Sequence, residues 1–170
     1  MKRIFLSIVI ISAALFSSYA QGNKKAEKDS LALLKFEQAV ATLQTKDWVI
    51  IVDSYETGGG IFETNSDAAN FLSYEKENVF MQGQIVSGNA HTNKLEVSNY
   101  EQATDKKGNV KVTMQVRGFF ITAKVDISLT KKSGDYADVI ITPTKGDMKR
   151  FSGYVVPRSQ SKYFKRTGEI

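Results

Sequence analysis

The chain has 170 residues, of which 42% are hydrophobic, 24% charged and 11% aromatic, with a formal net charge of +5. This composition is typical of a globular protein and excludes a disordered or collagen-like chain. The sequence contains no cysteine and a single histidine, His91. Disulfides, thiolate metal sites, a cysteine nucleophile and any multi-histidine metal centre are therefore excluded.

Residues 1–20 have the features of a cleavable signal peptide. A short basic start precedes an apolar run at 4–16, and Ser18 and Ala20 supply small residues at positions −3 and −1 before Gln21. Signal peptidase requires small residues at these two positions. The apolar run spans only about 20 Å, against a hydrocarbon core of roughly 30 Å, which argues against a transmembrane anchor. We expect the protein to be exported, with the periplasm favoured over the extracellular space.

The remaining chain predicts a short linker and one domain. Residues 21–28 are polar and predict a disordered tether, and residues 29–170 are long enough to bury a core without disulfides. Cleavage would remove two of the 23 basic residues and none of the 18 acidic ones, leaving a net charge of +3. This mild charge, together with export, argues against nucleic acid as a partner.

An amphipathic helix is predicted directly after the linker. Asp29 or Ser30 can cap its first turn, and its apolar residues recur at spacings of three, four and three. The polar face is not enriched in Lys and Arg, which favours a helix packed on the core over one lying on a membrane. The apolar residues of this stripe are Leu33, Phe36, Val40 and Leu43.

After Lys46 the apolar period changes from 3.6 to 2, which is the period of a half-buried strand. Short strands at regular spacing, with turn residues between them, predict a mainly β protein built as an antiparallel meander. A closed barrel would cover the apolar face and remove exposed edges, and an open, strongly curved sheet that cradles the helix is the alternative. The eight predicted strands are Trp48–Tyr55, Asn70–Tyr74, Val79–Val86, Lys94–Ala103, Asn109–Val116, Phe119–Thr130, Tyr136–Thr142 and Arg150–Val156.

Two of the predicted hairpins can be given a register. A two-residue turn at Arg117-Gly118 places Val116 opposite Phe119 and keeps apolar residues facing one another along both strands. In the next hairpin, a three-residue loop with glycine in the left-handed position places Leu129 opposite Ala137. The two registers give one apolar face that is continuous over three strands.

The strand predicted at 94–103 leaves two alternatives. Strict pairing with the following strand turns Asn99 and Glu101 toward the apolar face. Either a β-bulge near Ser98 shifts the phase and turns Tyr100 inward, or the interior holds two polar groups that would be ligand contacts. The bulge is favoured, because a buried glutamate is costly unless it is paired.

Candidate catalytic residues are few. His91 lies in a loop without a carboxylate to orient its imidazole, and the Gly58–Gly60 run lacks the lysine of a phosphate-binding loop. The acidic residues nearest that glycine run are best explained as solvated surface groups. We expect no catalytic site, no metal and no cofactor. The carboxylates considered are those of Asp53, Glu56, Glu63 and Asp67.

The C-terminal residues 145–170 combine many cations with aromatic side chains. Such a segment can bind an anionic glycan or a lipid headgroup by charge and stacking. It can equally form a solvated edge strand and tail, whose lysines discourage edge-to-edge pairing. The cations are Lys145, Lys149, Arg150, Arg158, Lys162, Lys165 and Arg166, and the aromatic residues are Tyr154, Tyr163 and Phe164.

Short motifs from about residue 70 onward carry a family resemblance. They are residues 70–73, 81–82, 97–100, 104–110, 116–118, 123–129, 153–157 and 159–165. In these motifs the chain resembles the Bacteroidetes family known as domain of unknown function 4251. The resemblance implies an exported β protein with an N-terminal helix, compatible with a lipocalin-like barrel, and it implies no established activity.

These observations favour a non-enzymatic, exported binding domain. Its ligand would be a small apolar molecule inside the barrel, or its surface would face another component of the cell envelope. The alternative is a surface interaction module with a filled core, which binds anionic glycans or lipid headgroups through the basic, aromatic C-terminus. An enzyme is disfavoured because no set of nucleophile, base and orienting group can be assembled from the sequence.

Overall fold

The computed structural model describes residues 24–170. The predicted signal peptide and residues 21–23 of the predicted linker lie outside these residues. A helix at 24–44 is followed by nine strands and two short helical segments. The elements are β1 (Asp47–Glu56), β2 (Phe62–Thr64), β3 (Phe71–Glu75), β4 (Asn78–Gln82), α2 (Gln84–Ser87), β5 (Thr92–Thr104), β6 (Val110–Arg117), β7 (Thr122–Leu129), β8 (Tyr136–Pro143), β9 (Lys149–Pro157) and η1 (Arg158–Gln160).

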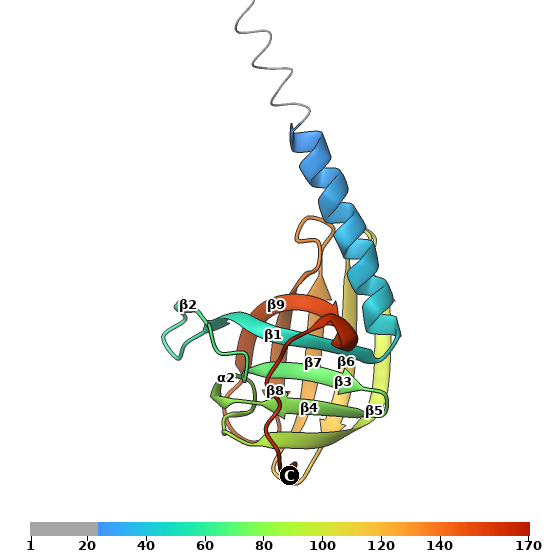
Figure 1. Ribbon diagram of the computed structural model, residues 1–170. Helices are drawn as coiled ribbons and strands as arrows, with labels where there is room; N and C mark the ends of the chain where they lie inside the picture. Colours follow the sequence, from blue (N-terminus) through green and yellow to red (C-terminus); the bar gives the residue numbers. More distant parts are fainter. Residues whose placement is uncertain (1–23) are drawn as a thin grey trace, which may run out of the picture.

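Eight strands form a closed antiparallel barrel. The sheet order is β2-β1-β3-β4-β5-β6-β7-β8-β9, and β1 also pairs with β9, which closes the barrel (Figure 1). The short strand β2 pairs with the end of β1 and adds a ninth strand outside the closed ring. The prediction of a barrel is confirmed over that of an open sheet. β2 was not predicted, because its three residues are all exposed and show no alternation.

The N-terminal helix packs on the barrel with only part of its length. Phe36, Ala39 and Leu43 are buried in the core, which confirms a core-facing helix. Leu33 was expected in the same stripe but is 41% exposed, because this part of the helix projects beyond the barrel (Figure 1). The helix also includes residues 24–28, where a tether was predicted. These residues contain no glycine or proline and favour helix by intrinsic propensity.

The strand predicted at Val79–Val86 is shorter than expected. β4 ends at Gln82, and Gly83 has a φ of 92°, a conformation that a strand of ordinary residues cannot continue. The chain then forms the short helix α2, which still turns Val86 into the core. The apolar residue at this position is therefore explained by a helical turn rather than by a strand.

The register predicted for the β7–β8 hairpin is confirmed, since Leu129 pairs with Ala137. The β6–β7 register is wrong by four residues, because Val116 pairs with Ala123 and not with Phe119. The loop is wider than two residues, and the Gly118 N–H donates to the Ile121 carbonyl at 2.7 Å. An even slip keeps every side chain on its predicted face. In the observed register β6 and β7 pair along their full lengths, from Arg117 opposite Thr122 to Val110 opposite Leu129.

The β-bulge predicted near Ser98 is present. The register of β5 against β6 shifts between Ser98 and Tyr100, and Asn99 adopts a φ of 64°. Tyr100 consequently faces inward, where its hydroxyl donates to the Leu43 carbonyl at 2.9 Å. Glu101 is exposed. The alternative with two polar groups inside the barrel is wrong.

The interior of the barrel is filled by one contiguous apolar cluster, which includes residues from the barrel strands and the helix. Its fully buried large side chains include Trp48, Met81, Met114 and Phe151. Within residues 24–170, no helix is long and apolar enough to cross a membrane. A filled interior leaves the ends and the outer face of the barrel as surfaces for binding.

Candidate binding site at the loop end of the barrel

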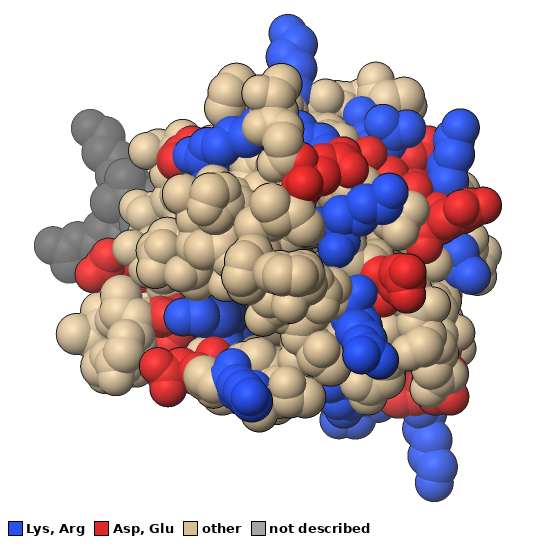
Figure 2. Space-filling view, turned by 90° about the horizontal axis from the view of Figure 1, so that it is seen from below, with Lys and Arg blue, Asp and Glu red and all other residues tan. Residues whose placement is uncertain are grey.

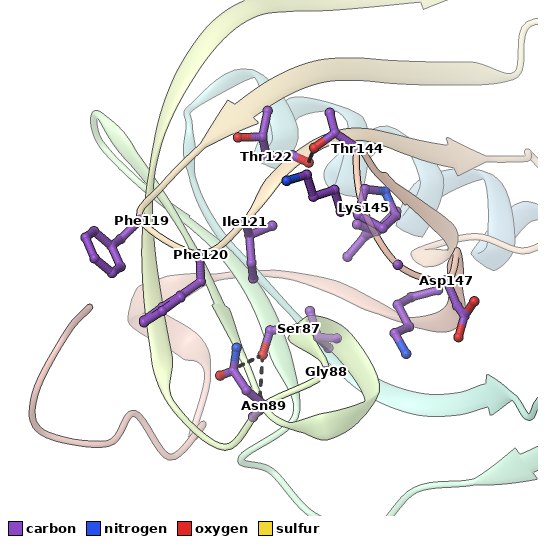
Figure 3. A pocket seen from close by; sticks show the side chains of 15 residues that line it. Ser87, Gly88, Asn89, Phe119, Phe120, Ile121, Thr122, Thr144, Lys145 and Asp147 are labelled. Atoms are coloured by element: carbon purple, nitrogen blue, oxygen red, sulfur yellow. Dashed lines mark hydrogen bonds between the residues drawn. The ribbon is translucent and has the colours of Figure 1, made fainter.

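Three connecting segments meet at the end of the barrel opposite the projecting helix, which we call the loop end. They are the segment from α2 to Asn89, the β6–β7 loop at 118–121 and the β8–β9 loop at 144–148. Figure 2 views the molecule from this end and shows basic and acidic side chains around an uncharged surface. A pocket of about 430 Å³ opens between the three segments (Figure 3).

The pocket lining is part apolar and part polar. Its accessible apolar surface comes from Ile121 and from Phe120, which forms a wall (Figure 3), while Val86 and Ile141 lie buried beneath it. Its volume falls within the range of about 300–1,000 Å³ that is common for small-molecule sites. The polar side chains of the lining include those of Asn89, Lys145, Asp147 and Lys149.

Glycine fixes the β6–β7 loop in its position. A Cβ atom added at Gly118 would lie 2.5 Å from the Leu95 side chain and 2.7 Å from the Lys94 carbonyl oxygen. Only glycine allows the loop to leave β6 so close to β5. The start of the β8–β9 loop is held to the same place, since the Thr144 N–H donates to the Thr122 carbonyl at 2.8 Å.

The segment after α2 is held by its own polar side chains. The Ser87 hydroxyl donates to the Gly83 carbonyl at 3.0 Å and to the Asn89 carbonyl at 3.2 Å. The Asn89 side chain donates to Asn93 at 3.2 Å and accepts from the His91 N–H at 2.9 Å. These groups therefore shape the pocket wall and have little remaining capacity for a ligand.

The two lysines of the rim differ in this respect. Within residues 24–170, neither Lys145 nor Lys149 forms an ion pair. Lys145 is exposed and Lys149 is half-buried, so their ammonium groups are the charges at the rim that a ligand can pair with. Asp147, on the same loop, is exposed and also carries no ion pair to a described residue.

Comparison with known proteins gives a similar structure. No protein-family model and no curated protein matches the sequence. The structure is similar to the crystal structure of a DUF4251 family protein from Bacteroides eggerthii DSM 20697, with a TM-score of 0.66 and 22% sequence identity. The similarity covers 78% of this chain and 94% of that one. The two chains share one fold. At this identity the DUF4251 structure supports the fold alone and transfers no ligand or activity.

The residues that the sequence offered as catalytic candidates are not brought together by this fold. His91 is exposed and does not line the pocket, and Gly58–Gly60 form the exposed turn between β1 and β2. The four carboxylates near that turn each bind a different partner. Asp53 accepts from Tyr136, Glu56 pairs with Arg150, Glu63 accepts from Tyr55 and Asp67 accepts from the Ala69 N–H.

The basic C-terminal segment packs against the outer face of the barrel (Figure 1). Tyr163 lies edge-on to Phe71 with ring centroids 4.7 Å apart, and both belong to a small apolar cluster outside the main core. The Gln82 side chain, which is fully buried, donates to the Phe164 carbonyl at 2.7 Å and accepts from the Arg166 N–H at 2.8 Å. The segment is thus part of the fold rather than a free tail.

Several cations of this segment also have partners within the protein. Arg158 pairs with Asp47 at 2.6 Å, and Lys165 pairs with Glu75 at 3.2 Å while lying 3.3 Å from the centroid of the Phe80 ring. Lys165 forms a second ion pair with Glu169, and Arg166 donates to the Ala90 carbonyl. The positive charge of these residues is used to hold the segment in place.

Sequence reasoning missed the residues that frame the pocket. Phe119 and Phe120 were expected at the start of a strand but lie in the β6–β7 loop, 83% and 66% exposed. A signal was present, since two adjacent aromatic residues cannot both face the core of an alternating strand. Lys145 and Lys149 were noted only as members of the basic C-terminal segment.

Proposed function

We propose that this protein is an exported, non-enzymatic binding domain, which takes a small amphiphilic molecule with an anionic group into the pocket at the loop end. The observation that carries the proposal is a pocket of about 430 Å³ with a mixed apolar and polar lining, and with two lysines at its rim that have no ion pair among the described residues. Export rests on the signal peptide predicted at residues 1–20, with the periplasm as the favoured compartment.

The pocket offers different surroundings to the apolar part and to the anionic group of such a ligand. An alkyl or ring portion would lie against Ile121 and Phe120, where it displaces water from accessible apolar surface. A carboxylate, sulfate or phosphate would lie at the rim beside Lys145 and Lys149, because hydrogen bonds between an ammonium group and an anion are stronger than those between neutral groups.

The lining supports binding rather than chemistry. The Ser87 hydroxyl is engaged with two backbone carbonyls, and the pocket lining contains no histidine to act as its base. Nucleophilic catalysis by serine needs such a base within hydrogen-bond reach. No set of nucleophile, base and orienting group is therefore proposed.

Titration with decanoate, a single-chain monoanion, tests the proposal. We expect decanoate to shift the backbone amide resonances of residues 86–89, 119–122 and 144–149 in the NMR spectrum of residues 21–170. Decanol, which lacks the charge, should shift the same amides at higher concentration. The variant Lys145→Met/Lys149→Met should bind decanoate about tenfold more weakly, since it removes the charged partners.

The matched control is Lys107→Met, which removes an exposed lysine from the β5–β6 turn at the other end of the barrel. It should bind decanoate as the wild-type protein does. If a folded wild-type protein shows no shifts around the pocket, or if the control weakens binding as much as the double variant does, the pocket is not the site. Native mass spectrometry of protein purified from the host's own envelope would then search for a ligand elsewhere.

A further inference from the structure

The β6–β7 loop ends in two exposed aromatic side chains, Phe119 and Phe120, which we call the aromatic tip. Their exposed fractions are 83% and 66%, and their ring centroids lie 4.6 Å apart with the ring planes at 86°. Phe119 points away from the barrel in Figure 3. Large exposed aromatic groups that lie together are uncommon on a soluble surface and mark an interaction site.

The loop geometry keeps the aromatic tip outside the core of the barrel. The loop is closed by the hydrogen bond from the Gly118 N–H to the Ile121 carbonyl, and the backbone at Gly118 is already in close contact with β5. Ile121 is half-buried and packs on the core cluster. Because the interior of the barrel is filled, no space is available there for either phenylalanine ring. The tip is held in the exposed position by the fold.

Cationic side chains lie on both sides of the aromatic tip. Lys94 and Arg117 line a second pocket, of about 490 Å³, which also includes Phe119. Lys145 and Lys149 lie on the side of the first pocket. Within residues 24–170 none of these four side chains forms an ion pair. Figure 2 shows this end of the molecule, where basic and acidic groups both surround an uncharged surface.

The same end also carries a further apolar group and two acids. Met148 is 56% exposed on the β8–β9 loop. Glu96 lies opposite Arg117 in the β5–β6 register and lines the same pocket as Lys94 and Arg117, and Asp147 adjoins Met148. Acidic groups are thus present at this end. The charged residues of β5 and β6 that line the pocket beside Phe119 nevertheless include two cations, Lys94 and Arg117. The arrangement is an apolar projection with unpaired positive charge at its base.

We propose that the loop end docks on a membrane surface that contains anionic lipid, with Phe119 and Phe120 inserted at the interface. Aromatic side chains favour the region between lipid headgroups and acyl chains. Lys and Arg residues at the base of the tip would lie at the level of the headgroups, where a negative surface potential attracts them. Each part of the arrangement therefore matches the layer of the bilayer that it would meet.

The shape of the tip favours a membrane over a protein or a glycan. A stable protein interface buries roughly 800 Å² on each partner, whereas the tip offers two adjacent rings on one short loop. The two rings are nearly perpendicular to each other, so they present no common flat face on which adjacent sugars of a glycan could stack. A bilayer requires neither a large flat surface nor a fixed ring orientation. This inference does not depend on what the pocket binds.

Vesicle co-sedimentation tests the inference. The experiment uses residues 21–170, because the whole barrel and its helix lie within the described residues 24–170 and the predicted signal peptide would itself bind lipid. One set of vesicles contains only phosphatidylcholine, and in the other about a third of the lipid is phosphatidylglycerol. We expect wild-type protein to bind the anionic vesicles more strongly. The variant Phe119→Ser/Phe120→Ser should bind both sets at least about tenfold more weakly, since it removes the inserted apolar surface.

The matched control removes exposed apolar groups from the opposite end of the molecule. Leu31 and Leu34 are 54% and 52% exposed on the projecting helix, and Leu31→Ser/Leu34→Ser should bind vesicles as the wild-type protein does. Lys94→Ala/Lys145→Ala should weaken binding to the anionic vesicles and leave binding to phosphatidylcholine unchanged. In a separate Phe119→Trp variant, brominated lipid should quench the emission of the new tryptophan.

Several outcomes would overturn the inference. It fails if the wild-type protein binds neither set of vesicles, if the phenylalanine variant binds like the wild-type protein, or if both serine variants lose binding equally. It also fails if sedimentation velocity shows a wild-type dimer that Phe119→Ser/Phe120→Ser converts to monomer without any vesicle binding. That result would assign the tip to a second copy of the chain. Failure of membrane docking would leave the proposed function standing, because decanoate binding is measured on the wild-type protein without vesicles.

Discussion

Single residues determine where the barrel closes. Gly153 on β9 pairs with Val52 on β1 at the seam between the last and first strands. A Cβ atom added at Gly153 would lie 2.1 Å from the Ile51 carbonyl oxygen, closer than a side chain can approach a backbone oxygen. The pairing of β1 with β9 therefore requires glycine at position 153, because any larger residue would push the two strands apart.

Gly153→Ala should accordingly destabilise the protein. We expect the free energy of unfolding to fall by about 1–3 kcal/mol, the usual cost of overpacking a fixed backbone. Urea denaturation followed by circular dichroism measures the change. Gly58→Ala is the control, because a Cβ atom there meets nothing within 4 Å and the change should stay within about 1 kcal/mol. Equal effects at the two glycines would contradict this account of the seam.

At the scale of elements, alternation in the sequence predicts which face of a strand is buried, but it does not predict the register of that strand against its neighbour. The β-bulge at Asn99 could be predicted, because one extra residue inverts the pattern of inward and outward side chains. The β6–β7 register could not, because an error of four residues leaves every face unchanged. The two phenylalanines were consequently placed in a strand. The pocket depends on this same loop and on two others that only barrel closure brings together, so its residues could not be assembled from the sequence.

The C-terminal segment shows a second limit of sequence patterns. Its cations suggested a free binding surface, yet their partners lie far away in the sequence, such as Glu75 for Lys165. The buried Gln82 side chain links this segment to the barrel through four hydrogen bonds, to Ala69, Phe164, Thr92 and Arg166. This buried amide therefore adds to the ion pairs and ring contacts that hold a segment whose only signal in the sequence was its charge.

Gln82→Leu should release the C-terminal segment. The substitution leaves the Phe164 carbonyl and the Arg166 N–H without their partner, and we expect a loss of about 2–4 kcal/mol in the free energy of unfolding. Hydrogen exchange should become faster in residues 161–170 before the barrel strands are affected. Gln115→Leu, at an exposed position on β6, is the control and should change neither quantity. If the segment keeps its protection in the Gln82 variant, other contacts hold it.

At the scale of the whole molecule, apolar residues pack on both sides of one barrel wall. The main core lies inside, beneath the helix, and the smaller cluster lies outside, beneath the C-terminal segment. One tyrosine on each side of this wall has a pKa that is raised by its surroundings. Burial raises the pKa of Tyr100, on the inner side, to about 12. Burial, together with the neighbouring Glu75 carboxylate, raises the pKa of Tyr163, on the outer side, to about 12.

These two tyrosines should make the protein unstable in alkali. Below the ordinary tyrosine pKa of 10.0, both side chains are neutral in the folded and unfolded states, so they add no dependence on pH. Above it, the unfolded chain loses its phenolic protons while the folded protein keeps them, which favours unfolding. The free energy of unfolding should therefore fall as the pH rises from 10 towards about 12, and the fall should level off above that.

The variants separate the two sides of the wall. Tyr100→Phe and Tyr163→Phe each lose a hydrogen bond, to the Leu43 carbonyl and to Glu75, and should be less stable at neutral pH. Each should nevertheless show a shallower fall in stability through the alkaline range, because one titrating group has been removed. Urea denaturation at a series of pH values measures both quantities. Burial also raises the pKa of Tyr74, so the double variant should retain part of the slope. A slope unchanged by either substitution would mean that alkaline unfolding begins elsewhere than at this wall.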